Sequence, residues 1–373
     1  MTTIRDIVSL FNAAYPLARA ENWDKVGLVI GNANANAHRV LVAHEVTDAT
    51  IDEAQNADAN CLVVYHPPIF RPLQNLDFAD HSVRLAARCI AANIHVIAVH
   101  TALDNAPFGR ALGDKLAAQL GLQNVRVLDA NGRETWCKLV VYVDDNDLEN
   151  VRNALWNAGA GVIGDYDEAS FRVSGKGTFR PREGANPTVG TIGEREEVDE
   201  WRLEVLVPQS KISDCVAAMK AAHSYEAVAH DIIKIENIGE SYGAARIGEL
   251  ISSTRFEDFA ADVQQKLNAP NLRLVASNKN AVQTIACMPG SGASYLNAAV
   301  KAGCNVLVSG DFKHHDALQA QAHNLALIDA THSATERAAI EMIAQVLETS
   351  STRLGFEVAR STIDTNPFAE MQP

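Results

Sequence analysis

The sequence predicts an α/β fold in which a doubly wound domain is interrupted by an inserted α+β module. In the first third of the chain, four short apolar runs alternate with two helical stretches. Strands and helices that alternate at this spacing are typical of a largely parallel sheet with helices on both faces. The last third returns to the same alternation, with three apolar runs and two helical stretches.

Each predicted element rests on an apolar run or on apolar residues at helical spacing. The predicted strands of the first third are residues 26–30, 39–43, 61–65 and 94–99, and its predicted helices are 48–57 and 82–92. The predicted strands of the last third are residues 283–287, 306–309 and 325–328, and its predicted helices are 294–302 and 315–322.

The middle of the chain has a different pattern. Its apolar runs at 138–143 and 204–207 are each followed by the polar start of a helix, and a glycine-rich stretch lies between them. Two β-α-β units of this kind indicate a ferredoxin-like module. We therefore expect one discontinuous α/β domain from residues 1–129 and 242–373, with an inserted ferredoxin-like domain at 130–241.

Composition excludes several classes of protein. With 373 residues, two or three domains are expected, and no run of about 18 uncharged apolar residues predicts a membrane span. A net charge of −14 and the lack of any basic run argue against binding to nucleic acid. The N-terminus lacks the features of a signal peptide, and the six cysteines are dispersed without a C-x-x-C pair. We expect reduced thiols in a cytoplasmic protein.

The chemistry-bearing residues follow predicted strands. His332 and Glu336 lie four residues apart where a helix begins, so they share one helix face. His66 follows the run 61–65, and the segment from His100 to Asp104 follows the run 94–99. Any one of these pairs alone is explained as well by helix capping or by a core histidine. Three such segments at strand ends favour a metal site, since His and carboxylates ligate zinc, iron or manganese.

Two further features allow more than one interpretation. Asp311 and His315 follow the run 306–309, where they would orient a substrate or move a proton; capping by Asp311 and a surface histidine pair explain them equally well. The glycine-rich run 289–294 suits an anion cradle or a plain tight turn. Because it lacks a dinucleotide fingerprint and a P-loop, we predict no nucleotide cofactor.

An ordered set of motifs resembles the Nif-three-like dinuclear-metal family, whose members are often called type 2 GTP cyclohydrolase I homologues. The motifs of the outer segments are WDKVGL at 23–28, HPPIF at 66–70, HTALD at 100–104, GDFKHHDA at 310–317 and DATHSATE at 329–336. Those of the middle are GKGTFRP at 175–181, GANPTVG at 184–190 and HSYE at 223–226, which are similar to the inserted module of longer members. The resemblance therefore covers almost the whole chain.

The resemblance implies a centre of two divalent ions per chain. Its implied ligands are His66, Asp104, His332 and Glu336, with Asp104 or Glu336 bridging the ions and His100 as an additional ligand or supporting partner. Tyr65 departs from the family pattern, because many members have a second histidine there. Without this histidine, one of the two metal positions lacks a ligand, which a Tyr65 oxygen or water would have to supply.

His44 and Glu45 replace an apolar residue and an aspartate that are common in the family. The sequence assigns them no role.

Two metal ions would clamp an oxygen-rich substrate and generate hydroxide at neutral pH. We therefore expect a metal-dependent hydrolase that acts on a small phosphorylated or nucleotide-like substrate. The alternative is a non-enzymatic regulatory or metal-handling protein, which a coordinatively saturated site would favour. The resemblance further implies a homo-oligomer, a hexamer to which the insert adds contacts.

Overall fold

The computed structural model describes residues 1–237, 239–269, 271–278 and 281–368. The chain divides into two compact units, one formed by Met1–Gly132 with Ser241–Pro373 and the other by Arg133–Glu240. We call them unit 1 and unit 2. Short strands lie where the chain leaves and re-enters unit 1, namely β6 (Gly132–Arg133) and β11 (Ser241–Tyr242). No helix of the described residues is long and apolar enough to cross a membrane.

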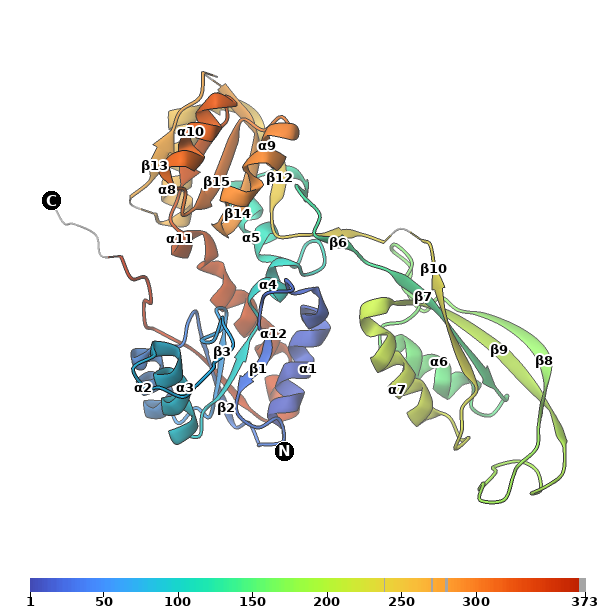
Figure 1. Ribbon diagram of the computed structural model, residues 1–373. Coiled ribbons are helices and arrows are strands. Elements are labelled where there is room, and N and C mark those ends of the chain that lie inside the picture. Colours follow the sequence, from blue (N-terminus) through green and yellow to red (C-terminus); the bar gives the residue numbers. More distant parts are fainter. Residues whose placement is uncertain (238, 270, 279–280, 369–373) are drawn as a thin grey trace. The chain divides into compact units, whose positions relative to one another are not determined.

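Unit 1 contains a five-stranded sheet of order β1-β4-β3-β2-β17 (Figure 1). Its strands are β1 (Gly27–Ile30), β4 (His95–Ala98), β3 (Cys61–Val64), β2 (Arg39–Ala43) and β17 (Glu357–Arg360). Neighbouring strands are parallel except that β1 runs antiparallel to β4. The carboxyl ends of β2, β3 and β4 therefore meet at one edge of this sheet.

Both faces of this sheet are covered because its strands are apolar on both sides. Val40 and Val42 point into one core and Leu41 and Ala43 into another, as the two-residue period of a strand requires. The first core is covered by α1 (Ile4–Ala14) and α12 (Ala338–Leu354), and the second by α2 (Asp48–Asn56) and α3 (His81–Ala91).

A six-stranded sheet of order β13-β16-β15-β14-β12-β5 forms the rest of unit 1. Its strands are β13 (Arg273–Val275), β16 (Ala326–Asp329), β15 (Val306–Gly310), β14 (Ala281–Ser291), β12 (Arg246–Arg255) and β5 (Gln123–Val127). Helices α5 (Leu112–Leu120) and α8 (Phe256–Leu267) cover one face, and α9 (Leu296–Lys301) and α10 (His314–Ala322) cover the other. The short helices α4 (His100–Asp104) and α11 (His332–Glu336) follow the ends of β4 and β16.

The structure confirms a mixed α/β protein but differs from the expected single, largely parallel layer. Unit 1 has two sheets, and in the second only β14, β15 and β16 are mutually parallel. The strands β5, β12 and β13 are antiparallel to their neighbours and were not predicted. The edge strands β5 and β13 are largely exposed, and β12 is buried only over its first three residues, so none of the three has the continuous apolar run that marks a buried parallel strand.

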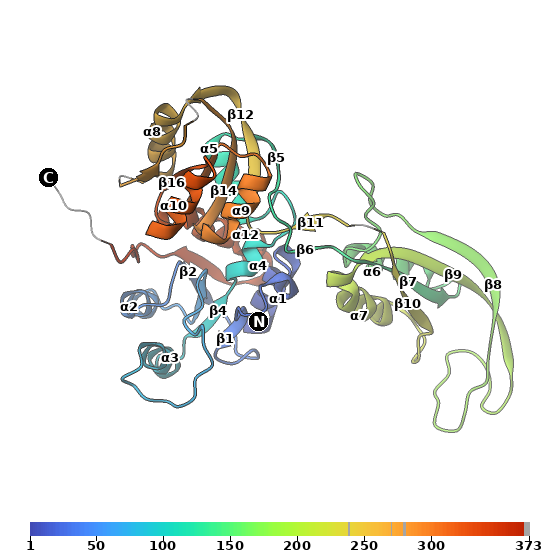
Figure 2. The same cartoon turned by 45° about the horizontal axis from the view of Figure 1, so that its top comes forward.

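Unit 2 has the element order β-α-β-β-α-β. Its elements are β7 (Trp136–Val143), α6 (Leu148–Asn157), β8 (Phe171–Phe179), β9 (Glu196–Pro208), α7 (Ile212–Ala222) and β10 (His230–Ile235). They form an antiparallel sheet of order β10-β7-β9-β8. Figure 2 shows α6 and α7 on the same face of this sheet, where they pack on alternate residues such as Leu139 and Leu203. The described residues also contain 3-10 helices at Leu17–Arg19, Gln209–Lys211 and Ala293–Tyr295.

A buried ion pair joins the two chain segments that make up unit 1. The guanidinium of Arg246 on β12 is fully buried and donates to both carboxylate oxygens of Asp114 on α5. It also donates to the carbonyls of Gly243 and Ala245. The planar guanidinium donates to all of these acceptors at once. Because the charge is buried, removal of either partner would leave the other charge without compensation.

Arg246→Met should therefore lower the free energy of unfolding of unit 1 by about 3–5 kcal/mol, because Asp114 would remain buried without its partner. The matched control is Arg255→Met on the same strand. Arg255 has a side chain that is 70% exposed and pairs only across the surface with Glu257 and Asp258, so about 1 kcal/mol or less is expected. Urea titrations followed by far-UV circular dichroism compare the two. Equal losses in both variants would contradict this account of the pair.

Candidate metal centre

The centre is built where strands of both sheets end. His44 follows β2 directly and His66 follows β3, so the parallel strands bring both imidazoles to one edge of the first sheet. His332 begins α11 and Glu336 ends it, just after β16 of the second sheet. Because the two residues are four apart on a helix, both side chains lie on the same face. We call His44, His66, His332 and Glu336 the His–Glu cluster.

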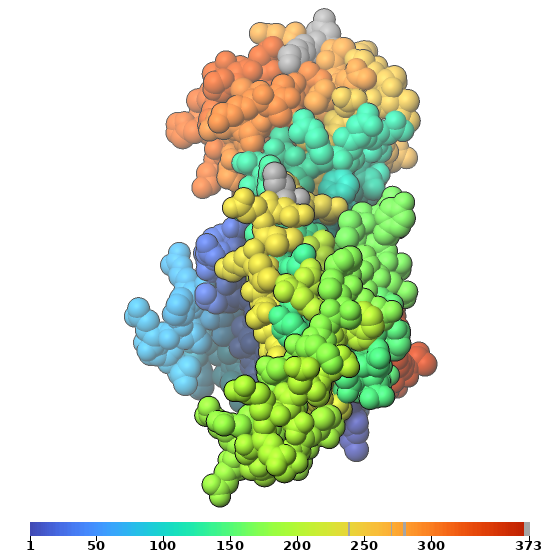
Figure 3. All heavy atoms as spheres, turned by 90° about the vertical axis from the view of Figure 1, so that its right-hand side faces the viewer, coloured from blue at the N-terminus to red at the C-terminus, as the bar shows by residue number. Residues whose placement is uncertain are grey.

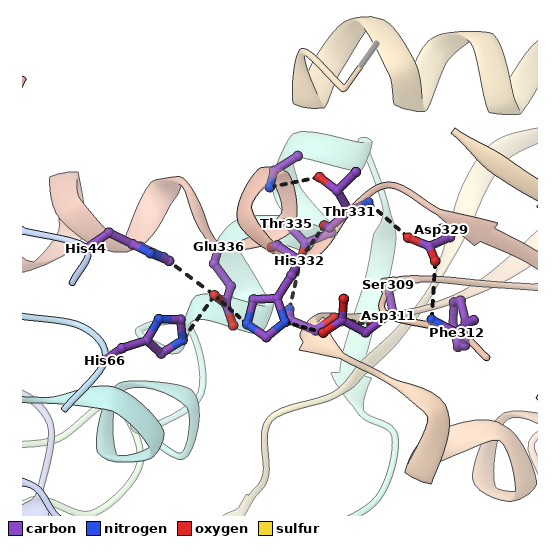
Figure 4. Close-up of polar contacts among 12 residues, drawn as sticks. His44, His66, Ser309, Asp311, Phe312, Asp329, Thr331, His332, Thr335 and Glu336 are labelled. Carbon is purple, nitrogen blue, oxygen red and sulfur yellow. Dashed lines mark hydrogen bonds and ion pairs between the residues drawn. The ribbon is translucent and has the colours of Figure 1, made fainter. Parts of the chain in front are cut away.

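One oxygen atom lies at the middle of this cluster (Figure 4). Glu336 Oε2 is 3.1 Å from Nε2 of His332, 3.3 Å from Nε2 of His66 and 3.5 Å from Nε2 of His44. The Glu336 side chain is only 4% exposed. Yet Glu336 Oε2 and His44 Nε2 are buried without a hydrogen-bond partner in the part of the chain that the structure describes. The three short approaches are thus charge contacts without hydrogen-bond geometry.

Two carboxylates behind the cluster orient its imidazoles. Asp311 Oδ2 lies 2.7 Å from Nδ1 of His332, and Glu45 Oε1 lies 3.2 Å from Nδ1 of His66. Glu45 also lies 3.9 Å from Nδ1 of His44. In the neutral imidazole, a carboxylate at Nδ1 favours the tautomer whose proton is on that nitrogen, so that Nε2 is the nitrogen able to ligate a cation.

The donor set fits a divalent metal ion. His44, His66 and Glu336 each offer one ligand atom, and these atoms all lie within 4.8 Å of one another. Imidazole nitrogens with one carboxylate are the ligands that zinc, iron and manganese accept, and ligating histidines usually donate their other nitrogen to a carboxylate. An unpartnered buried carboxylate oxygen among three imidazoles is what a shared cation would satisfy.

The electrostatics of the cluster are strongly coupled. Burial alone would raise the pKa of Glu336, but His332, His44 and His66 hold it well below its usual range. Burial alone would lower the pKa of His66, yet Glu336 and Glu45 raise it to about 9. For His332, Glu336 and Asp311 outweigh burial in the same way and raise the pKa to about 9. Without a metal, protons therefore neutralise the cluster.

A second polar group adjoins the His–Glu cluster. Tyr65 donates a 2.8 Å hydrogen bond to Asp104, and the ring centroids of His100 and His66 are 5.1 Å apart. The pKa of Asp104 is raised to about 7, chiefly by complete burial; the charge of His100 opposes this shift and the charge of Glu336 adds to it. Burial and the nearby Asp104 raise the pKa of the Tyr65 phenol well above 10, so this side chain is a neutral donor.

Strained backbone holds the segments of the centre. His100, Asp311 and Thr331 have positive φ angles of 23°, 61° and 67°, which non-glycine residues rarely adopt. The carboxylate of Asp329 links two of them, since it accepts hydrogen bonds from the amides of Phe312 and Thr331 (Figure 4). This carboxylate therefore fixes both the residue after Asp311 and the residue before His332.

Two glycines provide the space that the ligands occupy. A Cβ atom at Gly290 would lie 2.2 Å from Oε1 of Glu336, and its backbone φ is +69°. A Cβ atom at Gly310 would lie 2.5 Å from the amide nitrogen of His332. Gly290 also donates its amide hydrogen to Thr335 Oγ1 at 2.9 Å. The predicted turn at residues 289–294 thus packs directly against the cluster.

The structure brings together most of the residues singled out from the sequence. His66, His332 and Glu336 lie in the cluster, and Tyr65, His100 and Asp104 lie in the adjoining group. Asp311 contacts His332, whereas His315 is exposed on α10, where its recorded ring contact is with His314.

His44 and Glu45 belong to the centre although the sequence assigned them no role. Their position directly after a predicted strand was the available signal. The family resemblance did not indicate this role, because an apolar residue is common in the family at the position of His44.

Comparisons with known proteins identify the family of the chain. A family model described as Duf34/NIF3 (NGG1p interacting factor 3) matches residues 2–367. A Bacillus subtilis protein named GTP cyclohydrolase 1 type 2 homolog is 36% identical over 366 residues, which cover 98% of this chain and 97% of the relative. A Halalkalibacterium halodurans protein of the same name is 35% identical over 364 residues, covering 97% of each.

A solved structure extends the likeness to the fold. The crystal structure of a Bacillus cereus protein related to NIF3 aligns with a TM-score of 0.84 at 35% identity and covers 99% of both chains. The match of the family model over nearly the whole sequence, together with these relatives, shows that the chain belongs to the Duf34/NIF3 family.

Proposed function

We propose that this protein is a metal-dependent hydrolase with a dinuclear centre, acting on a small phosphorylated or nucleotide-like substrate. One observation carries the proposal. Three imidazoles direct Nε2 at a single buried carboxylate oxygen that has no hydrogen-bond partner among the described residues, while carboxylates approach them from the Nδ1 side. That arrangement prepares neutral histidine ligands for a cation.

The first ion would be held by the His–Glu cluster. Asp104 and His100 would supply ligands for a second, with Glu336 as the carboxylate shared between them. His100 also has a carboxylate beside Nδ1, since Asp24 Oδ2 lies 3.0 Å from that nitrogen, although this approach lacks hydrogen-bond geometry. The raised pKa of Asp104, about 7, is also consistent with a position that favours added positive charge nearby.

When bound, divalent ions would supply a hydroxide nucleophile near neutral pH and polarise an oxygen of the substrate. The protein's own residues would then hold the ligands in their orientation. Asp311 fixes the ring of His332, and Glu45 fixes that of His66. Asp104 accepts a hydrogen bond from Tyr65, which would hold its carboxylate in place as a ligand.

The nucleotide-like substrate is supported by the relatives. The Bacillus subtilis and Halalkalibacterium halodurans proteins are named GTP cyclohydrolase 1 type 2 homologs, and such a reaction requires attack of water on a purine ring. Cytoplasmic location is supported by six free cysteines, all buried.

Homo-oligomeric assembly, as a hexamer, is part of the proposal. In unit 2, the strand order β10-β7-β9-β8 with helices on one face supports the ferredoxin-like organisation expected of the insert. Its outermost strand β8 exposes Phe171 and Val173, two residues apart and so on one face, by 65% and 50%. Figure 3 gives the surface of this unit, coloured green to yellow. An edge strand with exposed apolar side chains supports association.

The proposal is tested first by His44→Ala. Loss of one imidazole should weaken metal binding by at least about tenfold, the smallest loss typical even for groups behind the ligands. His38→Ala is the control, since the His38 side chain is 56% exposed and its carboxylate contact is Asp58 at the surface. Elemental analysis of protein purified without chelator, followed by chelator competition, measures the difference.

Hydrolysis is tested on the same preparations. The metal-loaded protein should release product from nucleoside phosphates, and Glu336→Gln should abolish that release while the circular dichroism spectrum is unchanged. An unchanged metal affinity of His44→Ala in chelator competition, or undiminished hydrolysis by Glu336→Gln, would make the proposal wrong.

Gly290→Ala should displace Glu336 and lower metal affinity about tenfold or more, because the new methyl carbon would overlap a ligand oxygen. Gly303→Ala is a matched control. Gly303 has a similar φ of +74°, so alanine is equally strained there, but no atom lies within 4 Å of its Cβ position. Calorimetric titration with zinc distinguishes the variants. If both lose the same affinity, backbone strain rather than contact with Glu336 is responsible.

Proton competition gives a pH dependence with a defined sign. In the metal-free protein the pKa values of His66 and His332 are raised from 6.5 to about 9. Their ion pairs with Glu336 therefore stabilise the fold fully below about pH 6.5, and this stability is lost as the pH rises through 9. Metal binding requires neutral imidazoles and so strengthens over the same range.

We expect the melting temperature of the metal-free protein to fall between pH 6.5 and 9 while its zinc affinity rises. Differential scanning fluorimetry and titration in a common buffer series measure both. The double variant His66→Gln with His332→Gln should flatten the melting profile. A metal-free melting temperature that increases with pH would refute the assignment.

A further inference from the structure

Two large aromatic side chains are exposed beside the metal centre. Trp23 is 58% exposed and Phe70 is 50% exposed. The ring centroid of each lies 5.8 Å from that of His100. His100 in turn contacts the rings of His66 and Tyr65, at 5.1 and 5.3 Å. The exposed aromatic surface is therefore one residue removed from the His–Glu cluster.

Trp23 is held in place by its neighbour. The side chain of Asp24 is fully buried, and its carboxylate accepts hydrogen bonds from the amide and hydroxyl of Thr101 and from the amide of Lys25. The same carboxylate contacts Nδ1 of His100. The buried Asp24 carboxylate thus anchors the backbone next to Trp23, although more than half of the Trp23 side chain is exposed to solvent. The anchor therefore does not serve to bury the indole.

Neither aromatic ring stacks on His100. The interplanar angles are 74° for Trp23 and 85° for Phe70, so both meet the imidazole edge to face. Because these contacts are perpendicular and both side chains are half exposed, aromatic surface remains available for a further ring.

We propose that Trp23 and Phe70 form the binding surface for a planar aromatic ring of the substrate, placing its reactive bond at the metal centre. The inference rests on the proposed function and deepens it, because it assigns residues to the base-like part of the substrate. A net charge of −14 gives this protein no general attraction for an anionic ligand. Affinity must then come from the ions and from apolar contact, and stacking of a base on aromatic side chains is a strong source of it.

Tryptophan fluorescence offers a direct measurement. Trp23 is the sole tryptophan of unit 1, since Trp136, Trp156 and Trp201 belong to unit 2. Replacing those three with phenylalanine leaves Trp23 as the emitter. The zinc-loaded protein is titrated with GMP and with ribose 5-phosphate, which share sugar and phosphate but differ in the base. Equilibrium dialysis on the unmodified chain gives the same affinities if the triple variant fails to fold.

We expect GMP to quench Trp23 saturably and to bind about 5- to 150-fold more tightly than ribose 5-phosphate, the range expected for one stacked base. Trp23→Ala and Phe70→Ala should each remove most of that preference without lowering zinc content. Phe78→Ala is the control: Phe78 is 64% exposed in the same segment as Phe70 and is not among the rings recorded in contact with His100.

Equal affinity for GMP and ribose 5-phosphate would overturn the inference, as would a preference that survives in both aromatic variants. A change in oligomeric mass in Trp23→Ala with an unchanged preference would also overturn it and would assign the surface to an interface. If the protein hydrolyses non-aromatic phosphates as fast as nucleotides, the proposed function stands and this inference fails. If it prefers GMP over ribose 5-phosphate but hydrolyses no substrate, the inference stands and the proposed function fails.

Discussion

The arrangement of unit 1 around its centre depends on one buried carboxylate, that of Glu336. It belongs to a helix that follows the second sheet, yet two of the imidazoles around it, His44 and His66, come from the first. A charge that is only 4% exposed is unfavourable unless opposite charge surrounds it. The same contact therefore joins the two sheets and requires a cation, whether protons on the histidines or a metal ion.

Other features of the unit serve this one contact. Gly290 leaves room for the carboxylate, and Asp329 fixes the turns on either side that carry Asp311 and His332. Asp311 and Glu45 then set the orientation of the rings. The strained φ angle of Thr331 is the local consequence, because the chain must turn sharply between β16 and α11 to direct His332 at Glu336. Strain of this kind persists only where the surroundings impose it.

Much of this could be predicted from local pattern alone. Strand ends placed His66, His100 and Asp104 at one edge, and the four-residue spacing placed His332 and Glu336 on one helix face. The antiparallel strands β5, β12 and β13 were not predicted because none of them carries a continuous buried apolar run. The resemblance placed His332 and Glu336 with His66 and Asp104, but not the meeting of two separate sheets, since sequence spacing holds no information on the approach of α11 to the first sheet. That approach is what gives His44 its role.

The discontinuity of unit 1 has a consequence for biosynthesis. His66 precedes Glu336 by 270 residues, and β17, which borders β2, comes later still. At a translation rate of about 5–20 residues per second, roughly 15–50 s pass between the synthesis of His66 and that of Glu336. Unit 2 is contiguous and can fold meanwhile. A nascent chain cannot assemble the four-residue cluster before Glu336 has been made, so a product that ends before Glu336 lacks the contact that joins the two sheets.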